Sequence, residues 1–347
     1  MNSFFIEYRD PMFGIIILFA VVFVISFANY WWGVFKSKEE KDSIEKFVKK
    51  FEIVSDEKEY KKLLQDSNIP IESLALLADA YGKSGDYEKA INIYLVALKR
   101  VKGKDKKQYI LSNLGKTYFK AGFLSRSSEV FLESLRLHPR NEESLKYLTV
   151  VYERLKEYDK AGEVLDALEE LGAVVQKQKL YLQVLQIIGD TKITNQKKEK
   201  RLEGISLKER FLQRKYFEFM QQNRLKIPED ILKKLYFKNL TDLLWFCDEN
   251  WLDLSSVSDS IPRQIAMAKG KTEYEKIDDG IFAFDVLGAL KKDGSVEADL
   301  NFQYMCSECK NVYPLYFYRC PNCLAIGSVK IQSTIVKAND EKNIPFL

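Results

Sequence analysis

Three stretches of this chain repeat the same pattern of apolar, small and aromatic residues. Within each stretch the apolar residues recur three or four positions apart, which is the spacing of one face of an α-helix. The small residues Ala90, Ser127 and Ala161 fall at equivalent positions, 37 and 34 residues apart. The other matching positions are Leu74, Ala78 and Tyr81 in the first stretch, Leu111, Gly115 and Tyr118 in the second, and Leu145, Thr149 and Tyr152 in the third. A regular helical repeat therefore organises the middle of the chain.

A period near 34 residues with this pattern is the signature of the tetratricopeptide repeat (TPR), a helix pair that stacks on its neighbours. The predicted fold class is therefore mainly α, with a TPR helical solenoid over residues 36–188. The clear repeats cover about 71–104, 108–141 and 142–172. Three repeats are close to the minimum for a stable array. We therefore expect flanking helices at 42–51, 56–65 and 177–188 to cap it.

TPR arrays bind partners on the concave face that their first helices line. Aligning the repeats places acidic, basic and aromatic side chains on this face, a mixture that favours a peptide or a protein surface as the partner. The candidate partner-binding residues are Glu72, Asp79, Lys83, Tyr109, Lys116, Phe119, Lys120, Lys146, Glu153 and Arg154.

Residues 189–270 follow the repeats as a linker with additional helices. The lysine-rich stretch 189–204 indicates a loop, and 207–222 and 229–251 indicate helices, with Pro228 in the first-turn position that suits proline. The apolar run 243–247 should pack on the solenoid or on the C-terminal domain.

The N-terminus carries a candidate transmembrane helix at residues 12–35, preceded by a short extracytoplasmic segment, 1–11. No charged residue lies between Pro11 and Phe35, and these 25 residues would form a helix of about 37 Å, enough to cross a hydrocarbon core of about 30 Å. Lysines are frequent after the span, whereas Arg9 is the only basic residue before it. By the positive-inside rule, we expect a single-pass protein with its N-terminus outside and its C-terminal body in the cytoplasm.

The C-terminal segment 271–347 has the most specific motif, two Cys-x-x-Cys pairs. We expect a small β-rich domain here, with short strands at 280–286 and 296–302. Two such pairs match a four-cysteine tetrahedral metal site of the zinc-ribbon type, which leaves no open position for a substrate. Zinc is the expected metal and iron is the alternative, since four thiolates suit both. The candidate ligands are Cys306, Cys309, Cys320 and Cys323, whereas Cys247 has no partner pair and should be a buried apolar residue.

Composition argues against two functional classes. Lys and Arg number 54 against 50 Asp and Glu, so the net charge of +4 gives no basic stripe for nucleic acid. The only histidine is His138, and the chain has neither a phosphate-binding loop nor a nucleophile elbow. We therefore predict that the protein is not an enzyme.

Together these parts resemble the lipopolysaccharide assembly protein B family. The resemblance is sharpest at Tyr304, the two cysteine pairs, Leu315-Tyr316, Pro321 and Lys330. It implies a rubredoxin-like metal domain that folds back onto the repeats, with the four cysteines as ligands. It also implies an inner-membrane adaptor that links a membrane AAA+ protease to a client in the lipopolysaccharide pathway. Lys310 and Leu324 depart from the family, because rubredoxin-type sites often have glycine at these positions.

Two other functions remain open at this point. The same architecture suits a chaperone or assembly factor for another inner-membrane machine, such as the stator of the flagellar motor. Four thiolates that hold iron would instead suit an electron-transfer protein. Visible colour of the purified protein would favour the hypothesis of an iron-containing electron-transfer protein.

Overall fold

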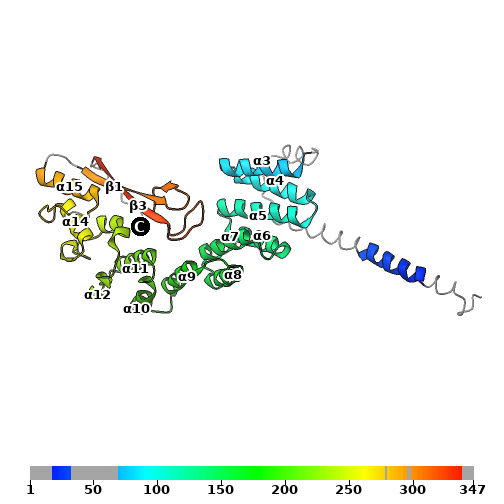
Figure 1. Cartoon of the computed structure of the whole chain (residues 1–347), viewed down its shortest axis with the longest axis horizontal. Helices are drawn as coiled ribbons and strands as arrows, with labels where there is room; N and C mark the ends of the chain where they lie inside the picture. Colours follow the sequence, from blue (N-terminus) through cyan, green and yellow to red (C-terminus); the bar gives the residue numbers. More distant parts are fainter. Residues whose placement is uncertain (1–17, 33–68, 278–279, 295–297, 338–347) are drawn as a thin grey trace, which may run out of the picture. The chain divides into compact units, whose positions relative to one another are not determined.

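A computed structural model describes residues 18–32, 69–277, 280–294 and 298–337 (Figure 1). The chain divides into two compact units, Met1–Leu155 and Lys156–Leu347, and the division falls within the third expected repeat. The expected capping helices at 42–51 and 56–65 and the segment 1–11 lie outside the described residues.

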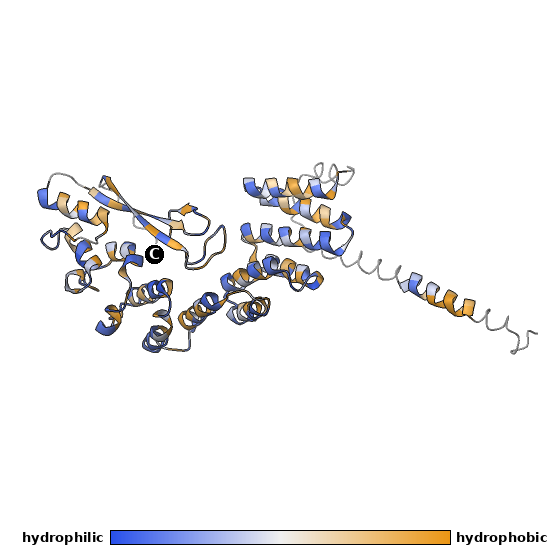
Figure 2. Ribbon diagram, in the orientation of Figure 1, coloured by the Kyte–Doolittle hydropathy of each residue, from blue (hydrophilic) through white to orange (hydrophobic). Residues whose placement is uncertain are grey.

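Residues 18–32 form a helix whose side chains are all exposed. Its large apolar residues include Phe19, Phe23 and Ile25, and the hydrophobic turns are evident in Figure 2. Within the described ranges, no helix combines the length and the apolar character needed to span a membrane. The remaining parts of the expected span, 12–17 and 33–35, fall outside those ranges.

The first unit contains the first two helix pairs that the repeat pattern predicts and the first helix of the third. Its helices are α3 (Ile71–Ser84), α4 (Tyr87–Arg100), α5 (Lys104–Lys120), α6 (Leu124–Leu137) and α7 (Glu142–Arg154). The turn between α3 and α4 uses Gly85 at φ 89°, in the left-handed region that favours glycine, and Asp86 then caps α4 by accepting the N–H of Lys89.

The repeated small residues lie where α5 and α6 cross. A Cβ atom on Gly115 would come within 2.8 Å of the Phe131 ring, and the Ser127 hydroxyl donates to the Gly115 carbonyl at 2.9 Å. Phe131, Tyr118 and Leu111 are fully buried. The small residues of the repeat therefore permit the close approach of two helices.

The second unit starts with helices and ends with a small sheet. Its helices are α8 (Tyr158–Glu170), α9 (Gln176–Gly189), α10 (Asn195–Ser206), α11 (Arg210–Gln222), α12 (Glu229–Leu232), α13 (Thr241–Trp245), α14 (Ser260–Ala268) and α15 (Phe282–Asp293), with 3-10 turns η1 (Phe237–Asn239) and η2 (Leu254–Ser256). The strands are β1 (Ala298–Cys306), β2 (Val312–Tyr313) and β3 (Val329–Lys337). α9 confirms the helix expected at 177–188.

The sheet has the antiparallel order β2-β1-β3. In β1, Leu300, Phe302, Tyr304 and Cys306 are buried at alternate positions, so one face of the strand turns inward. These residues share one core with apolar side chains of α9, α11, α13, α14 and α15. Cys306, the last residue of β1, therefore belongs to a sheet that is built into the helical core of this unit, and the other three candidate ligands lie in turns beside the sheet.

Three sequence-based expectations are wrong in this unit. Residues 282–293 form α15 instead of a strand, because Ala283, Phe284, Leu287 and Gly288 are buried at helical spacing. The expected loop 189–204 contains most of α10. Lys198, Leu202 and Ser206, four residues apart, form the buried face of α10, and the Lys198 ammonium group donates to the Ile188 carbonyl at 2.7 Å.

The helix expected at 229–251 is broken into α12, η1 and α13. Two backbone groups in this stretch form hydrogen bonds with side chains of α11. The N–H of Tyr236 donates to the side chain of Gln213, and the carbonyl of Asn239 accepts from Arg214. The apolar run 243–247 packs on β1 as part of the C-terminal domain, since Trp245 donates to Asp299 and Phe246 meets the Phe302 ring edge-on.

Candidate functional site

The first cysteine pair lies in a tight turn that follows β1. The N–H of Cys306 donates to the Asn311 carbonyl at 2.9 Å, and the N–H of Lys310 donates to the Cys306 carbonyl at 3.0 Å. Lys310 has φ 61°, which is in the left-handed region. The turn brings Cys309 back towards Cys306.

The second pair repeats this geometry. The N–H of Cys320 donates to the Ala325 carbonyl at 2.8 Å, and the N–H of Leu324 donates to the Cys320 carbonyl at 3.0 Å. Leu324 has φ 60°, which matches the conformation of Lys310. Each Cys-x-x-Cys turn is called a knuckle below. Lys310 and Leu324, at which the sequence departs from the family pattern, are thus the left-handed residues of the two knuckles.

The four sulfur atoms face one another. All four lie within 4.8 Å of each other. Cys306 and Cys323 are 3.7 Å apart, and Cys309 and Cys320 are 3.6 Å apart, so each of these pairs takes one sulfur from each knuckle. A tetrahedral zinc ion with Zn–S bonds of about 2.3 Å requires sulfur atoms about 3.8 Å apart. The cluster therefore has the spacing of a four-thiolate metal site, and all four cysteines are free of disulfides.

The surroundings of the cluster favour thiolate at two of the sulfurs. Burial opposes ionisation of Cys306, but hydrogen bonds from the Ser328 hydroxyl and from backbone N–H groups outweigh it and lower its pKa to about 6. The backbone N–H of Asn311 is the main cause that lowers the pKa of Cys309. Burial raises the pKa of Cys323 to about 12. A metal ion bound here would convert all four groups to thiolates.

The donor set fits a structural metal ion. Cys306 and Cys320 are fully buried, whereas Cys309 is half-buried and Cys323 is exposed. Four sulfur ligands fill a tetrahedral shell and leave no position for a reacting water. Such an ion would crosslink the two knuckles.

The sheet β1–β3 and its two cysteine turns are called the ribbon below. A buried ionic network joins the ribbon to the helices of the same unit, and sequence reasoning did not find this network. Arg214 of α11 forms a two-pronged ion pair with Asp242 of α13, at 2.6 and 2.7 Å. Tyr304 of β1, two residues before Cys306, donates its hydroxyl to the same carboxylate at 2.7 Å. Burial disfavours the charge of Arg214, but the Asp242 carboxylate outweighs this effect and raises the pKa of the guanidinium.

The segment between the knuckles continues the network. The Arg214 guanidinium lies 3.6 Å from the centre of the Tyr316 ring. Tyr316 meets the rings of Tyr304 and Tyr318 edge-on, and the Lys215 ammonium lies 4.6 Å from the centre of the Tyr318 ring. Aromatic residues between the cysteine pairs are the sequence signal for this docking, whereas no local pattern identifies Arg214 or Asp242.

Gly327 and Cys247 are two further residues of this unit whose type suits their surroundings. Gly327, with φ 61°, lies against α11, where a Cβ atom would come within 2.7 Å of the Phe211 ring. Cys247 is buried as predicted, and burial raises the pKa of its thiol to about 11.

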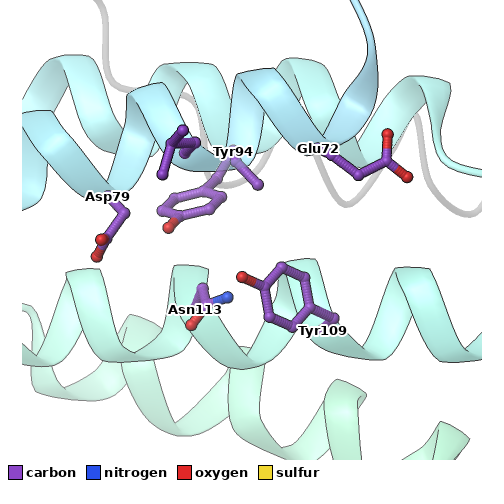
Figure 3. Close-up of a pocket in the computed structure, with 7 residues that line it drawn as sticks. Glu72, Asp79, Tyr94, Tyr109 and Asn113 are labelled. Carbon is purple, nitrogen blue, oxygen red and sulfur yellow. The ribbon is translucent and has the colours of Figure 1, made fainter.

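The first unit has a hollow between α3 and α5. Three of the predicted partner-binding residues, Glu72, Asp79 and Tyr109, line a cavity of about 460 Å³ (Figure 3). Sequence reasoning missed Tyr94, which reaches it from α4, and Asn113, although Tyr109 and Asn113 are four residues apart and share a helix face. Ala75 and Leu76 complete the lining.

The other predicted residues of this face lie outside the cavity. Lys83 forms an ion pair with Asp79, Lys116 with Glu143 and Lys146 with Glu142. The Arg154 guanidinium lies 4.4 Å from the centre of the Phe119 ring. Lys120 is exposed and Glu153 is half-buried.

Comparisons with known proteins support the repeat and nothing finer. Residues 73–108 match the family model described as tetratricopeptide repeat. None of the curated proteins matches the chain. A solved structure, BtubC (BKLC) from P. vanneervenii, is 16% identical, with 71% of this chain and 96% of that chain covered, but its TM-score of 0.29 is too low to carry an argument. Neither match names a lipopolysaccharide assembly protein, so membership of that family stays a prediction.

Proposed function

We propose that this chain is a scaffold, anchored in the bacterial inner membrane, that binds protein partners through its helical repeats and has no catalytic activity of its own. The observation that carries the proposal is the cavity between α3 and α5. It opens between the first helices of two successive repeats, where arrays of this kind bind their partners. The matching repeat model supports a protein-interaction role.

The N-terminal helix supports the membrane anchor. In residues 18–32, every side chain is exposed, and large apolar residues such as Leu18, Phe23 and Trp32 are more than half exposed. Such a surface is costly in water and is stable in a hydrocarbon layer. The lysines that follow this helix support a cytoplasmic location for the repeats and the metal domain.

A zinc ion is the metal that we propose for the four cysteines. Its role would be structural, because the sulfur shell is closed and the ribbon docks on α11 and α13 through Tyr304 and Tyr316. Iron in the same site would give the chain an electron-transfer function. The absorption spectrum separates these alternatives, since zinc bound to four thiolates has no visible colour and iron does.

The finer proposal follows the family resemblance. The chain would act as an adaptor that links a membrane AAA+ protease to a client in the lipopolysaccharide pathway and so controls the stability of that client. The alternative is a chaperone for another inner-membrane machine, such as the flagellar stator. The two proposals share one architecture and differ only in the partner.

A crosslinked pull-down of the full-length, membrane-embedded chain tests the proposal. Partners would be identified by mass spectrometry and compared with those of Cys320→Ser combined with Cys323→Ser, and with Cys247→Ala as a cysteine control outside the cluster. A membrane protease recovered with a lipopolysaccharide enzyme, lost in the double variant and retained in the control, is the expected result. Stator subunits would establish the chaperone role instead. A chain that recovers no specific partner would overturn the scaffold proposal.

A further inference from the structure

The cavity between α3 and α5 combines negative charge with aromatic rings. Glu72 and Asp79 line it, and no basic side chain is among the described residues of its lining. The rings of Tyr94 and Tyr109 form its other walls, and Asn113 lies beside Tyr109 on α5, opposite the Tyr94 ring (Figure 3). A volume of about 460 Å³ lies within the range of about 300–1,000 Å³ that is usual for ligand sites.

Tyr94 provides an independent sign that something binds here. Its residue is 2% exposed, and its hydroxyl lines the cavity without a hydrogen bond to any residue that the structure describes. Burial, with the nearby charge of Asp79, raises the pKa of this hydroxyl, so the group stays neutral and retains both its proton and its lone pairs. Because this hydroxyl faces the cavity, it is available to a ligand.

The lysines next to the two carboxylates do not block them. Lys83 pairs with Asp79 and Lys106 pairs with Glu72, both at 2.7 Å. The lysine side chains are 72% and 63% exposed, and exposed ion pairs contribute little to stability. A cation supplied by a ligand can therefore replace them at small cost.

A second hollow adjoins the first. Its volume is about 260 Å³, and it shares Glu72, Ala75 and Tyr109 with the larger cavity. Ile71 and Ile110 give it apolar walls. Asp105 and Lys106 also line the second hollow, and Tyr109 is part of the wall of both hollows.

We propose that these two hollows bind a short peptide segment of the partner, with a lysine or arginine side chain between Asp79, Tyr94 and Asn113 and a neighbouring apolar side chain against Ile71 and Ile110. The carboxylate and the tyrosine hydroxyl accept hydrogen bonds from the cation, and the aromatic ring faces attract it. This inference rests on the proposed scaffold function and names the chemistry of the partner. An acidic segment would instead be repelled by Glu72 and Asp79.

A random heptapeptide display library, selected on the purified full-length chain, tests the inference. The expected peptides share a basic residue next to an apolar one. In fluorescence anisotropy with the best labelled peptide, Asp79→Asn should weaken binding about 10-fold to 100-fold, as should replacement of the basic peptide residue by glutamine. Tyr94→Phe keeps the ring and should weaken binding less. Glu88→Gln, which removes an exposed charge on α4 outside the cavity, should leave binding unchanged.

Three results would overturn the inference: selected peptides without a basic residue, binding that Asp79→Asn leaves unchanged, or no selected peptide at all. Thermal melts of each variant by circular dichroism check that Asp79→Asn, at a half-buried helix position, keeps the fold. The scaffold proposal is tested separately. A partner that the pull-down recovers equally well with wild type and Asp79→Asn would exclude the cation site while leaving the scaffold function in place.

Discussion

Both terminal nitrogens of Arg214 donate to the carboxylate of Asp242, at 2.6 and 2.7 Å, and each side chain is only 3% exposed. The two residues are 28 positions apart in the sequence, on α11 and α13. Tyr304 completes the pair from β1. This ion pair is therefore the point at which the metal ribbon is fixed to the helical part of its unit.

Removing one partner of this pair should destabilise the second unit strongly. Asp242→Ala leaves the buried guanidinium with Glu218 alone as a counter-ion, at 3.2 Å from Nε, and removes both partners of its terminal nitrogens on Asp242. We expect a loss of about 3 kcal/mol in the free energy of unfolding. Tyr304→Phe removes one hydrogen bond to the carboxylate and should cost about 1–3 kcal/mol. Guanidinium denaturation followed by tryptophan fluorescence measures both values.

The control for this prediction removes both charges at once. Arg214→Met combined with Asp242→Leu leaves no unpaired charge, so most of the lost stability should return. If Asp242→Ala cost less than about 1 kcal/mol, the pair would not be the anchor that its geometry indicates.

The left-handed residue of the first knuckle should tolerate glycine better than lysine. Lys310 is exposed and has φ 61°, a conformation that costs a residue with a Cβ atom about 1–2 kcal/mol. Lys310→Gly should therefore raise the free energy of unfolding by about 1 kcal/mol. Lys310→Ala retains the Cβ atom and serves as the matched control, with no comparable gain. Equal stability of the two variants in thermal melts would contradict the account.

Two helical glycines should respond oppositely to alanine. At Gly115 the new Cβ atom would meet the Phe131 ring at 2.8 Å, and Gly115→Ala should destabilise the first unit by about 1–3 kcal/mol. At Gly162 in α8 nothing lies within 4 Å, so Gly162→Ala should stabilise its helix by about 0.5–1 kcal/mol. Chemical denaturation of the two variants checks the signs, and destabilisation by Gly162→Ala would refute the packing argument.

The sequence was most informative where the spacing of residues along the chain determines the local structure. Two Cys-x-x-Cys pairs predicted a cluster, and the structure brings Cys306, Cys309, Cys320 and Cys323 together. The repeat period predicted helix pairs, and small residues such as Gly115 lie at a helix crossing. In both cases, contacts between near neighbours in the chain determine the local structure.

Local patterns failed where a distant partner decides the structure. The strand expected at 280–286 is part of α15, because an apolar run this short does not distinguish a strand from a buried helix. The lysine-rich stretch 189–204 looked solvated, but the stem of Lys198 is buried and its charge reaches a backbone carbonyl. Arg214 and Asp242 could not be paired from sequence, since either residue alone reads as an ordinary surface charge.

Metal analysis of the purified full-length chain tests the central claim most directly. Mass spectrometry of the metals, with an absorption spectrum, should give one zinc per chain and no visible colour. Cys320→Ser combined with Cys323→Ser should remove that zinc, and Cys247→Ala should retain it. A wild-type chain that carries no metal and presents four reactive thiols at residues 306, 309, 320 and 323 would contradict the account of a metal-locked ribbon.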